Sequence, residues 1–332
     1  MAQHIVISSG DFNGIGPEII LKTLREVDLG NNTATILSSR QVVDYYRSKF
    51  NITLPCHTIE STDEAQSGTV NVLECYDDET VSIAPGTLSR QAGRCAMQAV
   101  ETGLTLCTTG EADALVTAPI SKEAVNRAGY YIPGHTEFLA EHTGTDDFLM
   151  MLVNDSLRVG LVSVHIPVAE VPGAVTEHAI ISHARTMHQS LKEDFGIARP
   201  RIAVLGLNPH AGDGGIIGKE EMEIITPALQ KIRDTGIEAS GPHPADGFFG
   251  NRTYKNCDGV LAMYHDQGLI PFKALSFGAG VNFTAGLPIV RTSPDHGTAF
   301  DIAGKGNADP SSFKHAFQLA VQLSANRKKE SV

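Results

Sequence analysis

Residues 258–310 read DGVLAMYHDQGLIPFKALSFGAGVNFTAGLPIVRTSPDHGTAFDIAGKGNADP, and this stretch decides both the predicted fold and the predicted site. Its apolar run from Gly259 to Tyr264 predicts a buried strand. His265 and Asp266 follow where that strand should end, and ligands in open α/β sheets bind outside the carboxyl ends of the strands. Three side chains that suit an anion come next: Lys273, Asn282 and Arg291. A metal ligand and an anion clamp this close together in the sequence indicate an enzyme.

Size and composition narrow the class of protein. A chain of 332 residues suggests two domains. Its 42% hydrophobic residues, 32 glycines and absence of tryptophan fit an α/β enzyme with many loops. The formal net charge of −12 argues against a broad nucleic-acid-binding surface. An anionic small substrate would need basic residues concentrated in one place.

The cysteines and the first residues of the chain indicate the cellular compartment of the protein. The five cysteines are scattered and form no C-x-x-C pair, which argues against a disulfide framework and against a cysteine zinc site. The chain enters a strand-like run at His4–Ser8 without a basic and apolar leader, so we expect no signal peptide. No apolar run approaches the ~18 residues of a membrane span. We therefore expect a soluble cytoplasmic protein.

Strand-like and helix-like runs alternate along the chain. TATILSS (33–39) and ADALVTAPI (112–120) predict strands. Between them, a helix capped by Ser89 is expected to run to about Thr109. This alternation predicts an α/β protein with mostly parallel sheets and helices on their faces.

Three segments are rich in glycine. GDFNGIGPE (10–18) resembles a phosphate-cradling loop, but Glu18 would repel phosphate, so a simple strand-to-helix turn is favoured. GPHPADGFFG (241–250), which carries Asp246, is expected to be an irregular loop because of its prolines and glycines. DHGTAFDIAGKG (295–306) is expected to be a turn that continues as a helix.

His135 and Thr136 are predicted to lie in a loop just before a helix. Helix N-terminal amides, a hydroxyl and an imidazole together could receive an oxyanion or a phosphate. The alternative is that Thr136 only caps the helix, with Glu137 in its first turn. Both interpretations stay open at this point.

Three histidines follow three strand-like runs: His165, His210 and His265. If the strands are parallel neighbours, the imidazoles converge on one edge of the sheet and suit Zn²⁺ or a similar divalent ion. Asp246 and Asp266 would orient the imidazoles and raise their basicity, although Asp266 could also merely cap a turn. A metal bound to an alcohol lowers its pKa, which assists hydride removal from the alcohol carbon.

At these motifs the chain resembles the 4-hydroxythreonine-4-phosphate dehydrogenase family of pyridoxal phosphate biosynthesis. The matching pieces span nearly the whole chain: GDFNGIGPE, GHTEFLAEHTG, VSVHIPV, LNPHAGDGG, GPHPAD, AMYHDQGLIPFK and GVNFTAGLPIVRTSPDHGTAFDIAGKG. The resemblance implies a homodimer with a fold like that of isocitrate and isopropylmalate dehydrogenases, with two α/β/α domains. We expect residues 1–133 and 285–332 to form a first, cofactor-side domain and residues 134–284 a second, metal and dimer-side domain.

The resemblance also implies roles for individual residues. The metal ligands would be His165, His210 and His265, contributed by both subunits and holding Zn, Mg or Co. The substrate-binding residues would be His135, Thr136, Lys273, Asn282 and Arg291. Candidates for proton transfer are Lys273, Asp246 and Asp266. The cofactor, NAD or NADP, would be bound at Asp295, His296, Gly297 and Thr298.

The implied reaction is oxidation of 4-phosphooxy-threonine at C3, followed by loss of CO₂ to give 3-amino-2-oxopropyl phosphate. A paralogous dehydrogenase acting on 4-phospho-threonate, 4-phospho-erythronate or a dihydrodiol carboxylate is the alternative, and a non-catalytic metal-dependent binding protein for sugar acids is a second one. Two positions depart from the family pattern. Phe12 replaces the usual proline of the first loop, and Ala279 replaces a basic residue often found before GVN.

Overall fold

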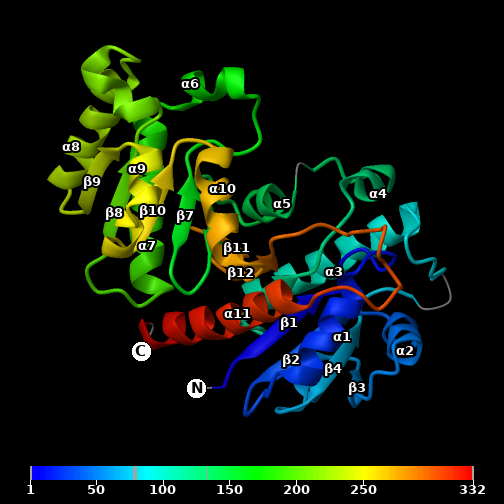
Figure 1. Ribbon diagram of the computed structural model, residues 1–332. Helices are drawn as coiled ribbons and strands as arrows, with labels where there is room; N and C mark the ends of the chain where they lie inside the picture. The colour runs from blue at the N-terminus through cyan, green and yellow to red at the C-terminus, as the bar shows by residue number, and fades with distance from the viewer. Residues whose placement is uncertain (1, 78–80, 133, 331–332) are drawn as a thin grey trace. The chain divides into compact units, whose positions relative to one another are not determined.

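The computed structural model describes residues 2–77, 81–132 and 134–330, and its contacts divide the chain into two units (Figure 1). Unit 1 comprises Met1–Gly144 and Leu287–Lys328, and unit 2 comprises Thr145–Gly286 and Lys329–Val332. Both units are α/β structures with mostly parallel strands, which confirms the predicted fold class. The predicted domain boundary at residue 133 lies outside the described residues, so the predicted domain limits stay a prediction.

Unit 1 is built on a sheet whose strands all run parallel, in the order β3-β4-β2-β1-β5-β12. These strands are β1 (His4–Ser8), β2 (Thr33–Ser38), β3 (Cys56–Ile59), β4 (Val70–Glu74), β5 (Ala114–Thr117) and β12 (Val290–Pro294). The α-helices are α1 (Gly16–Glu26), α2 (Arg40–Lys49), α3 (Arg90–Thr108), α4 (Lys122–Arg127), α5 (His135–His142) and α11 (Ser311–Glu330). The residues of β5 are buried throughout, as expected for a parallel sheet covered on both faces.

Local sequence explains where the helices of unit 1 begin. The side chain of Ser89 accepts a hydrogen bond from Ala92 N and so caps α3, which confirms the predicted start of that helix. Proline occupies the first turn of α1, where its missing N–H costs nothing. Within the described part of the chain, no helix combines the length and apolar character needed to cross a membrane.

Unit 2 contains strands in the order β11-β6-β7-β10-β8-β9, and only the pairings of β6 are antiparallel. Its strands are β6 (Leu149–Val153), β7 (Arg158–Leu161), β8 (Arg201–Leu205), β9 (Glu238–His243), β10 (Gly259–Ala262) and β11 (Val281–Ala285). Its α-helices are α6 (Val171–Ala174), α7 (Glu177–Glu193), α8 (Thr226–Asp234), α9 (Ala245–Gly250) and α10 (His265–Ser276).

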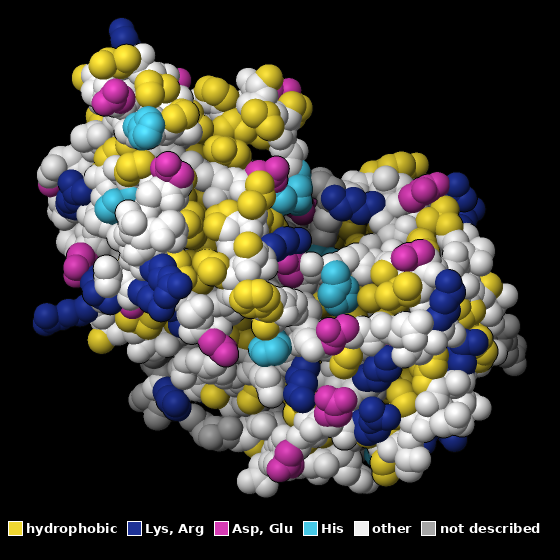
Figure 2. Space-filling model, viewed as in Figure 1, with side chains coloured by type: hydrophobic (Ala, Val, Ile, Leu, Met, Phe, Trp, Pro, Cys, Tyr) yellow, Lys and Arg dark blue, Asp and Glu magenta, His cyan; other side chains and the backbone are white. Residues whose placement is uncertain are grey.

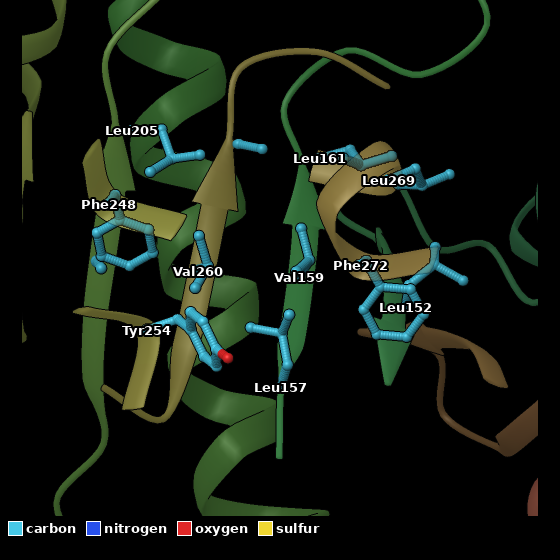
Figure 3. Packing of buried hydrophobic residues seen from close by; sticks show 12 residues of the cluster. Leu152, Leu157, Val159, Leu161, Leu205, Phe248, Tyr254, Val260, Leu269 and Phe272 are labelled. Carbon is cyan, nitrogen blue, oxygen red and sulfur yellow. The ribbon is translucent and has the colours of Figure 1, made fainter. Parts of the chain in front are cut away.

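The two faces of β7 and β10 pack against different helices. On one face, Val159 and Val260 belong to a buried cluster that also contains Leu269 and Phe272 of α10 (Figure 3). On the other face, glycines of β7 and β10 leave room for Met187 of α7, since an added Cβ at either would approach it within 2.7 Å. Successive side chains of a strand point to opposite faces of the sheet. The valines therefore pack against α10, which begins at His265, while the glycines face α7.

The expectation that GPHPADGFFG is irregular is wrong. Residues 241–243 close β9 and residues 245–250 form α9. Pro242 is tolerated because β9 lies at the edge of the sheet, where a missing N–H breaks no ladder. Pro244 occupies the N-cap position of α9, where its missing N–H removes no bond from inside the helix. The prolines that suggested a loop therefore lie in an edge strand and at the start of a helix.

Replacing Phe272 with alanine should lower the free energy of unfolding by about 3–5 kcal/mol, because it leaves a cavity under α10. Phe272→Leu fills most of that space and should cost less than about 1.5 kcal/mol. Urea unfolding followed by circular dichroism measures both changes. An alanine variant no less stable than the leucine variant would contradict the packing described.

Candidate functional site

The three histidines lie at one edge of the unit 2 sheet. They follow β7, β10 and β8, which are neighbouring parallel strands. His165 lies in the loop after β7, His265 is the first residue of α10, and His210 lies in η4 (Pro209–Gly215) after β8. The strands are therefore neighbours, which the prediction of a single metal site required.

His165 and His265 form a close pair. Their ring centroids lie 6.1 Å apart. His265 Nδ1 lies 2.8 Å from Asp266 Oδ1, so an ionised Asp266 keeps the proton on Nδ1 and leaves Nε2 able to bind a metal. Among the described residues, no three His, Cys, Asp or Glu side chains are arranged to hold a metal ion, so His210 does not complete the pair within one chain. The metal site stays a prediction.

A buried glutamate shapes the segment that carries His210. From His210 to Gly214 the backbone has φ values between 43° and 80°, a left-handed region that L-residues rarely occupy. Glu221 Oε1 accepts hydrogen bonds from Leu207 N and Asn208 N, each at 2.7 Å. Glu221 Oε2 accepts one from Asn208 Nδ2 at 2.9 Å. This carboxylate, which sequence analysis missed, anchors the residues that lead into the strained run.

A glutamine links two of the histidine segments. Gln267 Oε1 accepts a hydrogen bond from Met263 N at 2.7 Å, and its Nε2 donates to Gly206 O at 2.6 Å. Met263 and Gly206 are the first residues beyond β10 and β8. The side chain therefore fixes the spacing of the strand ends that deliver His265 and His210. Sequence analysis missed Gln267 because a glutamine in the first turn of a helix carries no distinctive signal.

The remaining predicted residues of unit 2 lie on three elements. Asp246 is exposed in the first turn of α9, while Asp266 and Lys273 are exposed on α10. Asn282 lies on β11, and its Oδ1 is buried without a hydrogen-bond partner among the described residues. A buried acceptor without a partner costs free energy, which a ligand donor would recover.

Unit 1 contains a buried cation at the carboxyl ends of its strands. Arg291 on β12 is 2% exposed. Its Nε and Nη2 donate to Thr117 Oγ1 at 3.1 and 2.7 Å, and Nη1 donates to Thr136 Oγ1 at 3.5 Å. Burial lowers the pKa of Arg291 to about 10, while the Glu137 carboxylate acts in the opposite direction. The guanidinium therefore stays charged at neutral pH.

His135 and Thr136 begin α5 beside this cation. Gly134 occupies the N-cap position, so His135 and Thr136 are the first two residues of the helix. The predicted loop position and the alternative that Thr136 is the helix cap are therefore both wrong. His135 Nε2 is buried and has no hydrogen-bond partner among the described residues. Burial, followed by the charges of Arg291 and Lys122, holds the pKa of His135 well below its ordinary value. The neutral imidazole, the hydroxyl and the guanidinium together suit an anion.

The predicted cofactor residues form a loop without the expected helical continuation. Residues 295–310 contain only turns and bends, and the next helix is α11. Positive φ at Ala299, Gly304 and Gly306 breaks any helical path. Asp295 N donates to Ser312 Oγ at 3.0 Å, whereas His296 and Gly297 are exposed. The loop is thus anchored at its start and open to solvent in its middle.

The first glycine-rich loop is a structural turn, as the charge of Glu18 suggested. Glu18 is buried, bonds Lys22 at 2.7 Å and accepts from Ala308 N at 2.9 Å. Ile15 N donates to Thr298 O at 3.0 Å, which attaches the loop to the predicted cofactor segment. Asp11 is fully buried, and its Oδ2 has no hydrogen-bond partner among the described residues. Burial raises the pKa of Asp11 to about 6.

Comparison with known proteins gives consistent matches. The sequence profile of the family described as pyridoxal phosphate biosynthetic protein PdxA matches residues 31–320. The 4-hydroxythreonine-4-phosphate dehydrogenase of Bacteroides thetaiotaomicron is 45% identical over 329 residues, which cover 98% of this chain and 90% of that protein.

Solved structures match this chain along nearly its whole length. The crystal structure of 4-hydroxythreonine-4-phosphate dehydrogenase from Klebsiella pneumoniae is 38% identical, with a TM-score of 0.88 and 98% of both chains covered. A terephthalate 1,2-cis-dihydrodiol dehydrogenase from Burkholderia xenovorans LB400 is 28% identical, with a TM-score of 0.68, and the match covers 97% of this chain and 98% of that one.

The stability of an Asp11→Asn variant should depend on pH differently from that of the parent protein. The folded chain holds the Asp11 proton more tightly than the unfolded chain does, so ionisation between the ordinary pKa of 3.8 and about 6 destabilises the fold. Relative to the parent, the variant should gain about 2.4 kcal/mol between pH 4 and pH 7. Urea unfolding at both pH values measures the gain, and an equal difference at both would contradict it.

Proposed function

Because this chain belongs to the PdxA family of pyridoxal phosphate biosynthetic proteins, we propose that it is an NAD(P)-dependent dehydrogenase of 4-phosphooxy-threonine (4-hydroxythreonine 4-phosphate). The C3 hydroxyl is oxidised to a ketone, and the resulting β-keto acid loses CO₂ to give 3-amino-2-oxopropyl phosphate for pyridoxal 5′-phosphate biosynthesis. The full-length likeness to a curated dehydrogenase carries this proposal. The enzyme works in the cytoplasm, where free cysteines such as its five stay reduced.

The substrate carries a phosphate, a carboxylate and an amino group, and the proposed binding residues match them by charge. In unit 1, Arg291 with His135 and Thr136 receives an anionic group. In unit 2, Lys273 neutralises a second anionic group, and the buried Oδ1 of Asn282 accepts a hydrogen bond from a hydroxyl or amine. Cations alone would not distinguish the substrate from other dianions, so the acceptor contributes specificity.

The proposed metal ligands fit a divalent ion of intermediate softness. Neutral imidazoles suit Zn²⁺ or Co²⁺ better than Mg²⁺, which prefers oxygen. The contact of His265 Nδ1 with Asp266 leaves Nε2 as the donor, as metal-binding histidines require. A divalent ion bound there would lower the pKa of the substrate hydroxyl. We propose that two subunits share each metal site. His165 and His265 would come from one subunit, and His210 would come from the other.

Oxidation at C3 removes a hydride and a hydroxyl proton. NAD or NADP, when bound, would supply the hydride acceptor, and the loop from Asp295 to Thr298, whose His296 and Gly297 are exposed, would hold it. Lys273, Asp246 and Asp266 are the proposed groups for taking or relaying the proton. Asp246 and Asp266 lie in the first turns of α9 and α10, and Lys273 lies in the last turn of α10.

Exposed apolar side chains support a homodimer formed through unit 2. Ile270 on α10 is 65% exposed, and Phe277, the C-cap residue that follows α10, is 92% exposed. Val168 and Ile216, in the segments that follow β7 and β8, are 78% and 84% exposed. In Figure 2, hydrophobic side chains gather over the region of α6. Apolar groups exposed beside all three histidine segments indicate a subunit interface that also completes the site.

One observation favours a second candidate function. The Burkholderia xenovorans dehydrogenase, whose substrate is a dihydrodiol of terephthalate, has the same fold at 28% identity. Oxidation of 4-phospho-threonate, 4-phospho-erythronate or a dihydrodiol carboxylate therefore stays the alternative. Ala279, which replaces a basic residue of the family pattern, is where a difference in the bound anion would arise.

The enzyme should form NAD(P)H with 4-phosphooxy-threonine, and a chelator should abolish this. Arg291→Ala should raise the KM for this substrate about thirtyfold, the loss expected from a buried charge partner. Arg127→Ala, which removes an exposed cation paired with Glu123, is the matched control and should leave KM unchanged. Initial rates measured at 340 nm, compared with rates on 4-phospho-threonate and a dihydrodiol carboxylate, decide between the two functions. An unchanged KM in Arg291→Ala means that the anion binds elsewhere.

Mixing two inactive variants should restore activity if two subunits share the metal ligands. His210→Ala and His265→Ala should each be inactive alone. In a mixed dimer, one of the two sites keeps His265 from one chain and His210 from the other, so activity and metal content should return to part of the parent level. Refolding the two variants together, followed by rate and metal measurements, tests this. No recovery in verified mixed dimers would mean that His210 and His265 of each site come from the same chain.

A further inference from the structure

A buried threonine, Thr117, holds one edge of the guanidinium of Arg291 in unit 1. Thr117 is the last residue of β5 and is 0% exposed. Its hydroxyl oxygen accepts hydrogen bonds from both Nε and Nη2 of Arg291, whereas Thr136 contacts Nη1 at the longer distance of 3.5 Å. Thr117 was not among the candidate residues, because a threonine that ends a strand has no signal in the sequence.

Strand register explains why the two side chains meet. β5 and β12 are parallel neighbours, with Arg291 opposite Leu115 and Thr292 opposite Val116. Thr117 lies two residues beyond Leu115 and therefore on the same face of the sheet as Arg291. The arginine side chain extends along that face toward the carboxyl ends of the strands and reaches the hydroxyl about 7 Å further on.

The chemistry of the contact differs from that of an ion pair. A carboxylate at position 117 would hold the guanidinium but would also cancel its charge. A hydroxyl holds the same Nε–Nη2 edge and adds no negative charge. Arg291 keeps a pKa of about 10 despite its burial, so the charge persists at neutral pH. The opposite end of the guanidinium, at Nη1, lies toward Thr136 at the start of α5.

We propose that Thr117 is a positioning residue of the anion site: it orients the guanidinium of Arg291 toward a phosphate or carboxylate of the substrate without neutralising it. This inference rests on the proposed function, since it assumes that Arg291 binds the substrate. Thr117 itself touches no substrate atom. Removing its hydroxyl leaves the charge in place but allows the guanidinium to turn.

Two substitutions at Thr117 separate the hydroxyl from the packing. Thr117→Val keeps the shape and removes the acceptor, and Thr117→Ser keeps the acceptor and removes a methyl group. Thr117→Val should raise the KM for 4-phosphooxy-threonine about tenfold, change kcat less than threefold and leave the KM for NAD(P) unchanged. Thr117→Ser should restore the KM to within about twofold of the parent value. A serine variant as impaired as the valine variant would overturn the proposal.

A matched control exists on the neighbouring strand. Thr292 is also 0% exposed, and its hydroxyl donates to Ala316 O rather than to Arg291. Thr292→Val should therefore lower the thermal midpoint without a change in either KM. If Thr117→Val and Thr292→Val raise the substrate KM equally, the effect is a general loss of packing and the inference fails.

If Thr117→Val folds poorly, a double-mutant comparison with Arg291→Ala still tests the proposal. In an Arg291→Ala background, Thr117→Ala should cause no further rise in the substrate KM, because the group that it orients is gone. Additive effects would overturn the proposal. An active parent enzyme with an unaffected Thr117→Val variant refutes this inference alone, whereas a parent enzyme inactive on every phosphorylated acid refutes the proposed function.

Discussion

A parallel sheet ends its strands at one edge, and this constraint organises both units. In unit 2 it brings the segments after β7, β10 and β8 together, so histidines roughly fifty residues apart along the chain share one edge. In unit 1 the register of β5 and β12 places Thr117 and Arg291 on the same face, and the arginine side chain reaches the carboxyl end of β5. The helices that cover the faces are spacers in this arrangement, and the chemistry lies where the strands stop.

The buried charges of Glu221 and Arg291 are held by different kinds of partner. In unit 2 the carboxylate of Glu221 is satisfied by backbone N–H groups and serves the conformation of a loop. In unit 1 hydroxyls hold the guanidinium of Arg291, and the neighbouring His135 stays neutral because burial and nearby cations disfavour its protonation. The carboxylate of Glu137 also acts on the guanidinium of Arg291 and favours its charged form.

Features that depend on residue type and local spacing could be predicted from the sequence, whereas contacts between distant residues could not. Strand-end histidines and the Ser89 cap depend on residue type and spacing, so the edge containing His265 was predictable. Gln267 and Thr117 act through contacts with residues 61 and 174 positions away, and no local pattern reports such contacts. The prolines near Asp246 misled the prediction because an edge strand tolerates what a central strand does not.

The discontinuity of unit 1 affects how the protein is made. Unit 1 takes β5 from before residue 145 and β12 from after residue 286, and all of β6 to β11 is synthesised in between. A nascent chain emerging from the ribosome can pair β1 to β5 early, yet Thr117 must wait for an arginine 174 residues downstream. Chains that terminate before residue 291 therefore lack the guanidinium that we propose as the anion-binding group, however well their first strands have folded.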